Sequence, residues 1–510
     1  SSFASHHFLP TEVLSSDALR GWVSDDETSM DATQDAFEVL RFIAQKRLAR
    51  MKLTVIDATN VQPEARKHLL ELAHEYHAKP IALVFDMSES VCLQRNQSRT
   101  DRTLPAYVIK RQKQQLRRSI NGLEREGFRG VHIFKNPEQV AEITITREKL
   151  YPDMKHETGP FDIIGDIHGC YDELVLLLEK LGYQVNSDTH QAIPPSQRRA
   201  IFVGDLVDRG LKSPDVLKLV MNMVNSGHAF CVVGNHDDKL LRALRGKKVN
   251  IGHGLEQTLA QLATESPEFI EQVKIFLSGL ASHYVFDNGA LVVAHGGIRE
   301  GMIGRVSGAI RSFALYGDTT GERDDYGLPV RRDWAVNYRG SAMIIYGHTP
   351  IARPQWVNNT LNIDTGCVFG GNLTALQYPE KVWVSVESLH QYAVPARPFT
   401  LDKPDLTTQH QVDDHLAIHD VLVLDDPMGK RHIETRLDGA VLIRNRNATA
   451  ALEVMSRFAV NPKWLIYLPP TMSPVQTSTL PNLLEHPDQA FGYYRDMGVE
   501  QVICQEKHMG

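Results

Sequence analysis

A chain of 510 residues is too long for one hydrophobic core, so we expect roughly two to four domains. Hydrophobic residues make up 42% and charged residues 23%, and no apolar run approaches the ~18 residues of a membrane span, which excludes membrane-spanning and disordered proteins. The net charge of -7 does not favour a nucleic-acid-binding protein, although a local basic stripe can bind nucleic acid on an acidic protein.

The five cysteines are widely separated, and no two of them form a C-x-x-C pair. They are Cys92, Cys170, Cys231, Cys367 and Cys504. This pattern predicts reduced thiols and argues against a zinc knuckle or a disulfide framework. The first residues lack a basic region followed by an apolar stretch, so we expect no secretion signal and a cytoplasmic protein. Because no methionine begins the chain and its last residues end within a motif, we expect a fragment, truncated at both ends.

The first part of the chain alternates apolar strands with helices. Such alternation predicts an α/β domain over residues 1–150, with a parallel sheet covered by helices on both faces. The expected strands are residues 53–56 and 80–85, and the expected helices are residues 35–51, 63–77 and 105–126.

Three stretches of this part carry residues suited to phosphoryl transfer. They are Ser15-Ser16-Asp17 followed by Arg20, then Val55-Ile56-Asp57-Ala58-Thr59-Asn60, and Arg95 with Arg99 in Cys92-Leu93-Gln94-Arg95-Asn96-Gln97-Ser98-Arg99. Together they resemble the polynucleotide 5′-kinase domains of the P-loop class. The first residues, Ser1-Ser2-Phe3-Ala4, resemble the end of a phosphate-binding loop whose glycines and lysine would precede them.

The kinase resemblance implies a role for each of these residues. Asp17 would accept the proton of the 5′-hydroxyl, and Arg20 would hold the substrate phosphate. Arg95 and Arg99 would cover the phosphates of ATP from a lid helix, and Ser1 would contact Mg2+. A solvated helix face is the alternative for Arg95 and Arg99. Without the loop lysine and glycines, this chain should bind ATP poorly and be a weak or inactive kinase.

A linker and a second α/β region follow. Residues 151–160, with two prolines and a glycine, are expected to be the linker. The ligand site of an α/β sheet lies at the carboxyl ends of its strands, so polar residues there are functional candidates. Five short apolar strands lead into Gly, Asp or His, namely residues 161–164, 200–203, 230–233, 290–293 and 343–346.

A short polar motif follows each of these strands. The motifs are Gly165-Asp166-Ile167-His168-Gly169, Gly204-Asp205-Leu206-Val207-Asp208-Arg209-Gly210, Gly234-Asn235-His236-Asp237, His295-Gly296-Gly297 and Gly347-His348-Thr349-Pro350. The set resembles the calcineurin-like metallophosphoesterases, which implies an α/β sandwich over residues 160–395. Two metal ions about 3.5–4 Å apart would neutralise the phosphate charge and activate a bridging water.

The resemblance also implies a role for each motif residue. His236 would protonate the leaving oxygen, oriented by Asp208, and Arg209 would clamp the phosphate. Carboxylate, imidazole and amide ligands together suit transition metals, and Mn2+ or Ni2+ is expected. The residues implied as metal ligands are Asp166, His168, Asp205, Asn235, His295 and His348, with Asp205 bridging both ions.

Two further features concern the surroundings of the metals. Asp237 stands where protein Ser/Thr phosphatases of this superfamily usually carry Glu and where dinucleoside tetraphosphatases favour Asp, so this position favours nucleotide over protein substrates. The stretch Asn362-Ile363-Asp364-Thr365-Gly366-Cys367 matches the closing strand of the family. Asp364 and Thr365 are expected to support the metal site without binding the ions.

Residues 405–510 form a third segment after a proline-rich passage, and we expect an α+β scaffold. The segment ends in Glu506-Lys507-His508-Met509-Gly510, which resembles the start of the nucleotidyltransferase of RNA-repair ligases. By this resemblance Lys507 takes AMP from ATP, with Mg2+, because a desolvated lysine is a competent nucleophile. Residues 436–439 lack such a lysine and are expected to form a turn.

Kinase, phosphatase and ligase segments in this order resemble the bacterial polynucleotide kinase-phosphatases of RNA repair. The family implies removal of a 2′,3′-cyclic phosphate, or of a 2′- or 3′-phosphate, from broken RNA ends. Its implied partners are RNA ends, ATP, a 3′-terminal RNA 2′-O-methyltransferase and a second copy in a homodimer. Two alternatives stay open, a dinucleoside polyphosphate hydrolase and a non-catalytic scaffold of a repair complex.

Overall fold

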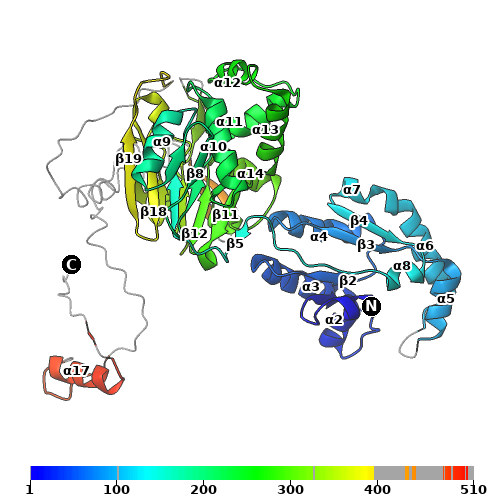
Figure 1. The fold of residues 1–510 in the computed structure, drawn as a ribbon. Coiled ribbons are helices and arrows are strands. Elements are labelled where there is room, and N and C mark those ends of the chain that lie inside the picture. The colour runs from blue at the N-terminus through cyan, green and yellow to red at the C-terminus, as the bar shows by residue number, and fades with distance from the viewer. Residues whose placement is uncertain are drawn as a thin grey trace. The chain divides into compact units, whose positions relative to one another are not determined.

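The computed structural model describes residues 2–99, 103–324, 328–395, 475, 477–483, 486–499 and 501–502, together with the backbone of residues 431–435 and 439–443 (Figure 1). The chain divides into two compact units, Ser1–Asp402 and Lys403–Gly510. Within the described ranges, no helix combines the length and the hydropathy of a membrane span.

The front of the first unit has the predicted α/β class. β1 (Val13–Ser15) pairs in parallel with β2 (Val55–Asp57), and β3 (Ile81–Phe85) pairs in parallel with β4 (Gly130–Phe134). The helices are α1 (Ser2–His7), α2 (Ser16–Ser24), α3 (Thr33–Ala49), α4 (Pro63–Glu75), α5 (Glu89–Gln97), α6 (Ala106–Ser119), α7 (Leu123–Glu126) and α8 (Pro137–Ala141).

The expected helix over residues 105–126 is interrupted. A 3-10 turn, η1 (Ile120–Gly122), separates α6 from α7, and Gly122 has the poor helix propensity that favours a break. Elsewhere the helical spacing of apolar residues is followed: Ala36, Leu40 and Ala44 are buried on one face of α3. This face packs on the core of the front segment.

The phosphoesterase part contains two large sheets and two small two-stranded ones, β7 (Gln184–Asn186) with β8 (Gln191–Ile193) and β13 (Thr319–Arg323) with β14 (Pro329–Arg331). The five-stranded sheet has the order β10 (Ala229–Cys231), β9 (Arg199–Phe202), β6 (Phe161–Ile164), β18 (Asn372–Tyr378) and β19 (Val382–Glu387). The six-stranded sheet has the order β16 (Gln355–Val357), β17 (Thr360–Asn362), β15 (Met343–Tyr346), β12 (Leu291–Ala294), β11 (His283–Phe286) and β5 (Asp153–Met154). All five predicted strands are present, three of them in the first sheet and two in the second. β5 shows that residues 151–160, expected to be a linker, also supply an edge strand that pairs with β11.

Alternate side chains of these strands enter different cores. In β6, Ile163 packs between the two sheets, whereas Ile164 packs under the helices. In β12, Val293 joins the core between the sheets and Val292 the core beneath α14 (Gly308–Tyr316). Because successive strand residues point to opposite faces, both faces of each sheet are covered, which gives the predicted α/β sandwich. The helices over the five-stranded sheet are α9 (Tyr171–Lys180), α10 (Ser213–Asn225), α11 (Asn235–Leu244), α12 (Leu255–Leu262) and α13 (Pro267–Gly279).

The second unit is described at three elements. β20 (Arg431–Thr435) pairs in antiparallel fashion with β21 (Gly439–Ile443), with Thr435 opposite Gly439. The helix α17 (Pro487–Asp496) begins with proline at its first position, where its missing N–H is not needed. Lys507 and residues 436–438 of the expected turn lie outside the described residues.

A buried histidine makes the stability of the phosphoesterase fold pH-dependent. Burial lowers the pKa of His283 from 6.5 to about 4. The free energy of unfolding is therefore highest above pH 6.5, where His283 is neutral in both the folded and the unfolded state. It falls by roughly 3 kcal/mol as the pH drops toward 4, because only the unfolded state binds a proton there. We expect His283→Gln to flatten the loss of unfolding free energy over this range, measured by urea denaturation. His156→Gln, at an exposed histidine, should leave the slope unchanged, and equal slopes for all three proteins would contradict the prediction.

Candidate metal centre

The loops after the five predicted strands converge on one centre. Asp205 Oδ2 lies 3.6 Å from His168 Nε2 and 3.4 Å from His295 Nε2. His295 Nε2 in turn lies 2.9 Å from Asn235 Oδ1 and 3.0 Å from His348 Nδ1. Asp205 is shared by two groups of side chains whose ligand atoms lie within 4.8 Å of one another, one with His168 and the other with His295 and His348. This position is the one that a bridging carboxylate requires.

Asp166 and His348 present buried atoms that have no partner among the described residues. Asp166 Oδ2 accepts a hydrogen bond from the backbone N–H of His348 at 3.0 Å, whereas its Oδ1 has no partner. Nε2 of His348 is also buried without one. Buried polar atoms rarely lack a hydrogen-bond partner, so we expect an ion beside each of these two atoms. At Gly347 a Cβ would collide with Asp166 Oδ1, which explains the glycine before His348.

The backbone of the centre is strained at the predicted residues. The φ angles of His168, Asp205, Asp208, Arg209 and His348 lie between 49° and 77°. Residues other than glycine rarely adopt this backbone conformation, which costs about 1–3 kcal/mol at each residue. Such strain persists only where the fold enforces it, and it clusters at functional sites.

Arg209 lies between two of the histidines. Its Nη1 is 2.6 Å from His168 Nε2, and its Nη2 is 3.1 Å from His236 Nε2. Nδ1 of His168 donates to the Val207 carbonyl at 2.9 Å, which leaves Nε2 as the acceptor. For His168 to bind a metal, the guanidinium must withdraw from Nε2, and a phosphate would attract it away.

His236 is held by a buried network. Nδ1 of His236 lies 2.6 Å from Asp208 Oδ2. The Thr258 hydroxyl donates to Asp208 Oδ1 at 2.8 Å and accepts from the Asp208 N–H at 3.0 Å. Thr258 belongs to α12, about fifty residues away in sequence, and no motif marks it. The network fixes the orientation of the His236 ring and keeps Nε2 directed into the centre.

The charges of the centre stabilise one another. Burial and the nearby Asp364 carboxyl raise the pKa of Asp166 well above its usual value. Burial would also raise the pKa of Asp205, but His295 and His236 hold it well below its usual range. Burial opposes a charge on His295, yet Asp205 and Asp166 raise its pKa to about 9. Asp205 and His295 therefore form an ion pair whose cationic part a bound metal would replace.

Asp237 and the closing strand support the loops. Asp237 is fully buried; Oδ1 accepts from Leu206 N–H at 3.0 Å and Oδ2 from Gly234 N–H at 2.9 Å. It thus ties the start of α11 to the loop that carries Asp205. Asp364 Oδ1 accepts from Gly366 N–H at 3.1 Å, and burial raises the pKa of Asp364 to about 6.

The predicted kinase residues lie on the front segment. Asp17 is in the first turn of α2 and forms an ion pair with Arg20 of the same helix. Arg20 is only 6% exposed, and its Nε donates to the Glu27 carbonyl at 2.9 Å. Asp57 ends β2 directly opposite Ser15 of β1. In this arrangement Arg20 holds Asp17, and it would have to leave this carboxylate to bind a phosphate.

The remaining predicted residues of the kinase and ligase are Arg95, Arg99, Ser1 and Lys507. Arg95 is exposed in the last turn of α5, and Arg99 is exposed just beyond it. Ser1 and Lys507 lie outside the described residues.

Three family models match the chain. They are the AAA domain over residues 1–119, the calcineurin-like phosphoesterase over residues 159–352, and the PNKP adenylyltransferase domain, ligase domain, over residues 450–510. An asymmetrical bis(5′-nucleosyl)-tetraphosphatase PrpE of Anoxybacillus flavithermus is 48% identical over 244 residues, which are 47% of this chain and 99% of that protein. This chain belongs to the calcineurin-like phosphoesterase family. The flanking matches confirm the predicted architecture of a polynucleotide kinase-phosphatase with a ligase segment.

Two further relatives cover the phosphoesterase part. The PrpE protein of Halalkalibacterium halodurans is 49% identical over 232 residues, 45% of this chain and 94% of that protein. A crystal structure of a protein provisionally described as a diadenosine tetraphosphatase has 27% identity and a TM-score of 0.35, covering 46% of this chain and 96% of that one. This calcineurin-like phosphoesterase is thus a metal-dependent phosphatase that also carries kinase-like and ligase modules.

The donor set fits the divalent metals that the family implies. Carboxylate, imidazole and amide groups meet within ligand distance of one another, and Asp205 is common to both groups of ligand atoms. Asp166 Oδ1 and His348 Nε2, which have no partner among the described residues, add two candidate ligand atoms. These observations are independent of the sequence motifs that first indicated the site.

Proposed function

We propose that the metal centre heals the 3′ ends of broken RNA, by removing 2′,3′-cyclic phosphate and 2′- or 3′-phosphate groups. The observation that carries the proposal is the presence of kinase-like and ligase modules in the same chain as the phosphoesterase. A ligase joins a 5′-phosphate to a free 3′-hydroxyl. A kinase supplies the first group, and a phosphatase that clears the 3′ end supplies the second.

Each residue of the centre has a place in this reaction. The six predicted ligands would hold two divalent ions, which supply an activated water and neutralise the phosphate charge. Arg209 would move from His168 and His236 to the phosphate oxygens. His236 would then deliver a proton from Nε2 to the departing ribose oxygen, while Asp208 stabilises the charged ring through Nδ1–H.

We further propose Mn2+ or Ni2+ as the metals of the centre, because its donors suit such ions. Mg2+ and ATP would serve the kinase and ligase modules. The proposal also includes action in the cytoplasm, a homodimer and a complex with a 3′-terminal RNA 2′-O-methyltransferase. The resemblance to the RNA-repair family implies these points.

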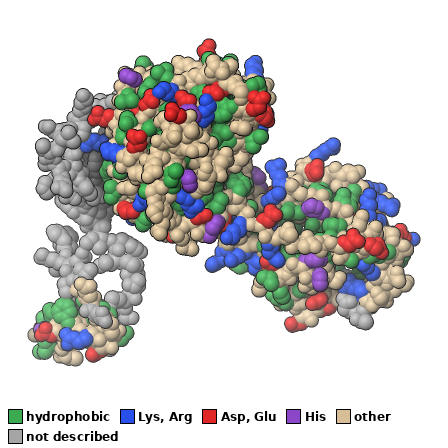
Figure 2. All heavy atoms as spheres, in the orientation of Figure 1, with side chains coloured by type: hydrophobic (Ala, Val, Ile, Leu, Met, Phe, Trp, Pro, Cys, Tyr) green, Lys and Arg blue, Asp and Glu red, His purple; other side chains and the backbone are tan. Residues whose placement is uncertain are grey.

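A basic pocket beside Asn235 supports a polyanionic substrate. On the face drawn in Figure 2, basic and acidic side chains are interspersed over the described residues of the phosphoesterase part. The pocket, of about 440 Å³, is different because its lining includes four cationic side chains and no acidic one. The lining residues are Asn235, Lys239, Arg242, Lys248, Val249, Asn250, Tyr316 and Arg323. Phosphates that adjoin the reacting group would fit here.

We expect Arg242→Gln with Lys248→Gln to raise the KM for an RNA end and to change kcat little. Each lost phosphate contact should reduce the salt dependence of log KM by about 0.7. KM measured against salt concentration checks this slope. Arg245→Gln with Lys247→Gln removes two exposed cations outside the pocket lining and serves as the matched control. Equal changes in both double variants would contradict a specific role of the pocket.

The proposed substrate is tested by phosphate release with added Mn2+. We expect an RNA that ends in a 2′,3′-cyclic phosphate to be turned over faster than diadenosine tetraphosphate at equal concentration. Turnover of the dinucleotide alone would favour the activity for which the PrpE relatives are named. Inactivity on both substrates, with no metal bound, would favour the scaffold alternative.

A further inference from the structure

A second group of potential metal ligands lies behind the catalytic loops. Cys170 and Glu173 stand at the start of α9, and Cys367 begins the 3-10 turn η5 (Cys367–Phe369). All three residues are buried, at 1%, 0% and 1% exposure, and their sulfur and carboxylate atoms lie within 4.8 Å of one another. No cysteine spacing predicts this cluster, because the fold brings together residues almost 200 positions apart.

Glu173 is the unexplained member of the group. Its Oε1 accepts hydrogen bonds from the Leu389 N–H and from the Tyr392 hydroxyl, both at 2.9 Å. Its Oε2 is buried and has no partner within the described residues, where no lysine, arginine or histidine forms an ion pair with it either. A buried carboxylate with neutral donors on one oxygen alone is costly. A carboxylate oxygen of Glu173 lies within 4.8 Å of the sulfurs of Cys170 and Cys367.

We propose that Cys170, Glu173 and Cys367 bind a thiophilic divalent cation of the Zn2+ type. Zinc prefers sulfur, nitrogen and carboxylate ligands in a tetrahedral arrangement, and these three side chains would supply three of its four ligands. On binding, the two thiols release two protons to solvent and two metal–sulfur bonds form. The cation would then give Glu173 Oε2 the partner that the described residues do not supply.

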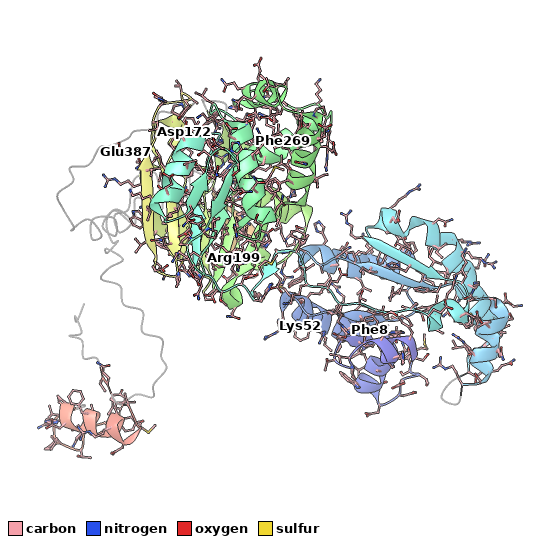
Figure 3. All side chains as sticks on the ribbon, in the orientation of Figure 1. Phe8, Lys52, Asp172, Arg199, Phe269 and Glu387 are labelled. Atoms are coloured by element: carbon pink, nitrogen blue, oxygen red, sulfur yellow. The ribbon has the colours of Figure 1, made fainter. Side chains whose placement is uncertain are left out.

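This site is separate from the catalytic centre. The predicted catalytic ligands offer oxygen and nitrogen only, whereas both sulfurs belong to the core between the five-stranded sheet and its helices. Helix α9 packs against β19, and Figure 3 labels Asp172 of α9 and Glu387 at the end of β19 at this end of the domain. The cation would join three segments: the start of α9, directly after the Asp166 and His168 loop, the turn after Asp364, and residues 389–392 beyond β19.

Cobalt substitution tests the proposal on the whole chain. Thiolate ligands give Co2+ an intense near-ultraviolet charge-transfer band, which oxygen and nitrogen ligands do not. We expect this band in the Co2+-loaded protein, a loss of at least half of its intensity in Cys367→Ser and in Cys170→Ser, and its full retention in Cys231→Ser, a control at another buried cysteine. Absence of the band from the unaltered protein, or full intensity in both cluster variants, would overturn the proposal.

Two further measurements do not depend on the folding of the cysteine variants. X-ray absorption of the zinc-loaded protein should show sulfur neighbours at about 2.3 Å. Glu173→Gln keeps an acceptor for Leu389 and Tyr392 but removes the charge, and we expect zinc retention against a chelator to fall by at least the roughly 10–100-fold typical of changes around metal sites. Zinc without sulfur neighbours, or unchanged retention, would count against the site. The outcome is independent of which phosphate ester the enzyme hydrolyses.

Discussion

Asp205→Asn should reduce kcat/KM for RNA phosphate release by about 10³-fold or more, the equivalent of roughly 4 kcal/mol or more of transition-state stabilisation. Among the described residues, two groups of potential ligands contain histidines of the centre, and Asp205 is the one residue that belongs to both. The substitution keeps the size of the side chain and an oxygen to accept the His236 N–H, which lies 2.9 Å from Oδ1. The loss should therefore come from the bridging charge, with a matching fall in bound metal measured by elemental analysis.

The matched control for this prediction is Asp188→Asn. Asp188 is an exposed acid outside the centre, so the same chemical change there should leave both activity and metal content unchanged. If Asp205→Asn retained two metals and full activity, Asp205 would not bridge the ions. A loss of activity with no loss of metal would assign Asp205 an electrostatic role instead.

The sequence predicts that the motif residues converge, because the signal of each motif is local. Each ligand follows a short buried strand, and the carboxyl ends of β6, β9 and β10 meet because these strands pair in parallel. The order of the motifs thus indicates the candidate ligands, including those that follow β12 and β15, although these two strands belong to a second sheet. The division into two sheets was implied only by the family resemblance, since apolar strands alone do not show which neighbour they pair with.

Features that depend on distant contacts are not visible in the sequence. Thr258 holds Asp208 from a different helix, and an ordinary helical threonine carries no signal of that role. The role of Arg20 at a phosphate stays a prediction, and its burial and its ion pair with Asp17 are features that the sequence alone does not show. Cys170 and Cys367 likewise come together only through the fold.

His236→Ala should slow the reaction of RNA phosphate esters by about 10²–10⁴-fold, the usual contribution of a general acid. The ribose oxygen of these substrates is a poor leaving group and needs the proton that His236 would supply. p-Nitrophenyl phosphate releases a stable phenolate without protonation, so its kcat should fall less than about tenfold. Comparing kcat for the two substrates in the same variant therefore isolates proton donation from metal binding.

Asp208→Asn provides the graded comparison for this prediction. It keeps the shape of the side chain and the contact with Thr258, but it removes the charge that stabilises the protonated His236 ring at 2.6 Å. We expect a smaller loss than in His236→Ala, again concentrated on the RNA ester. Equal losses on both substrates would instead place His236 among the metal ligands, since it lies within 4.8 Å of His168 and Asp205. The ratio of the two losses therefore decides whether the imidazole acts on the leaving oxygen or on the metals.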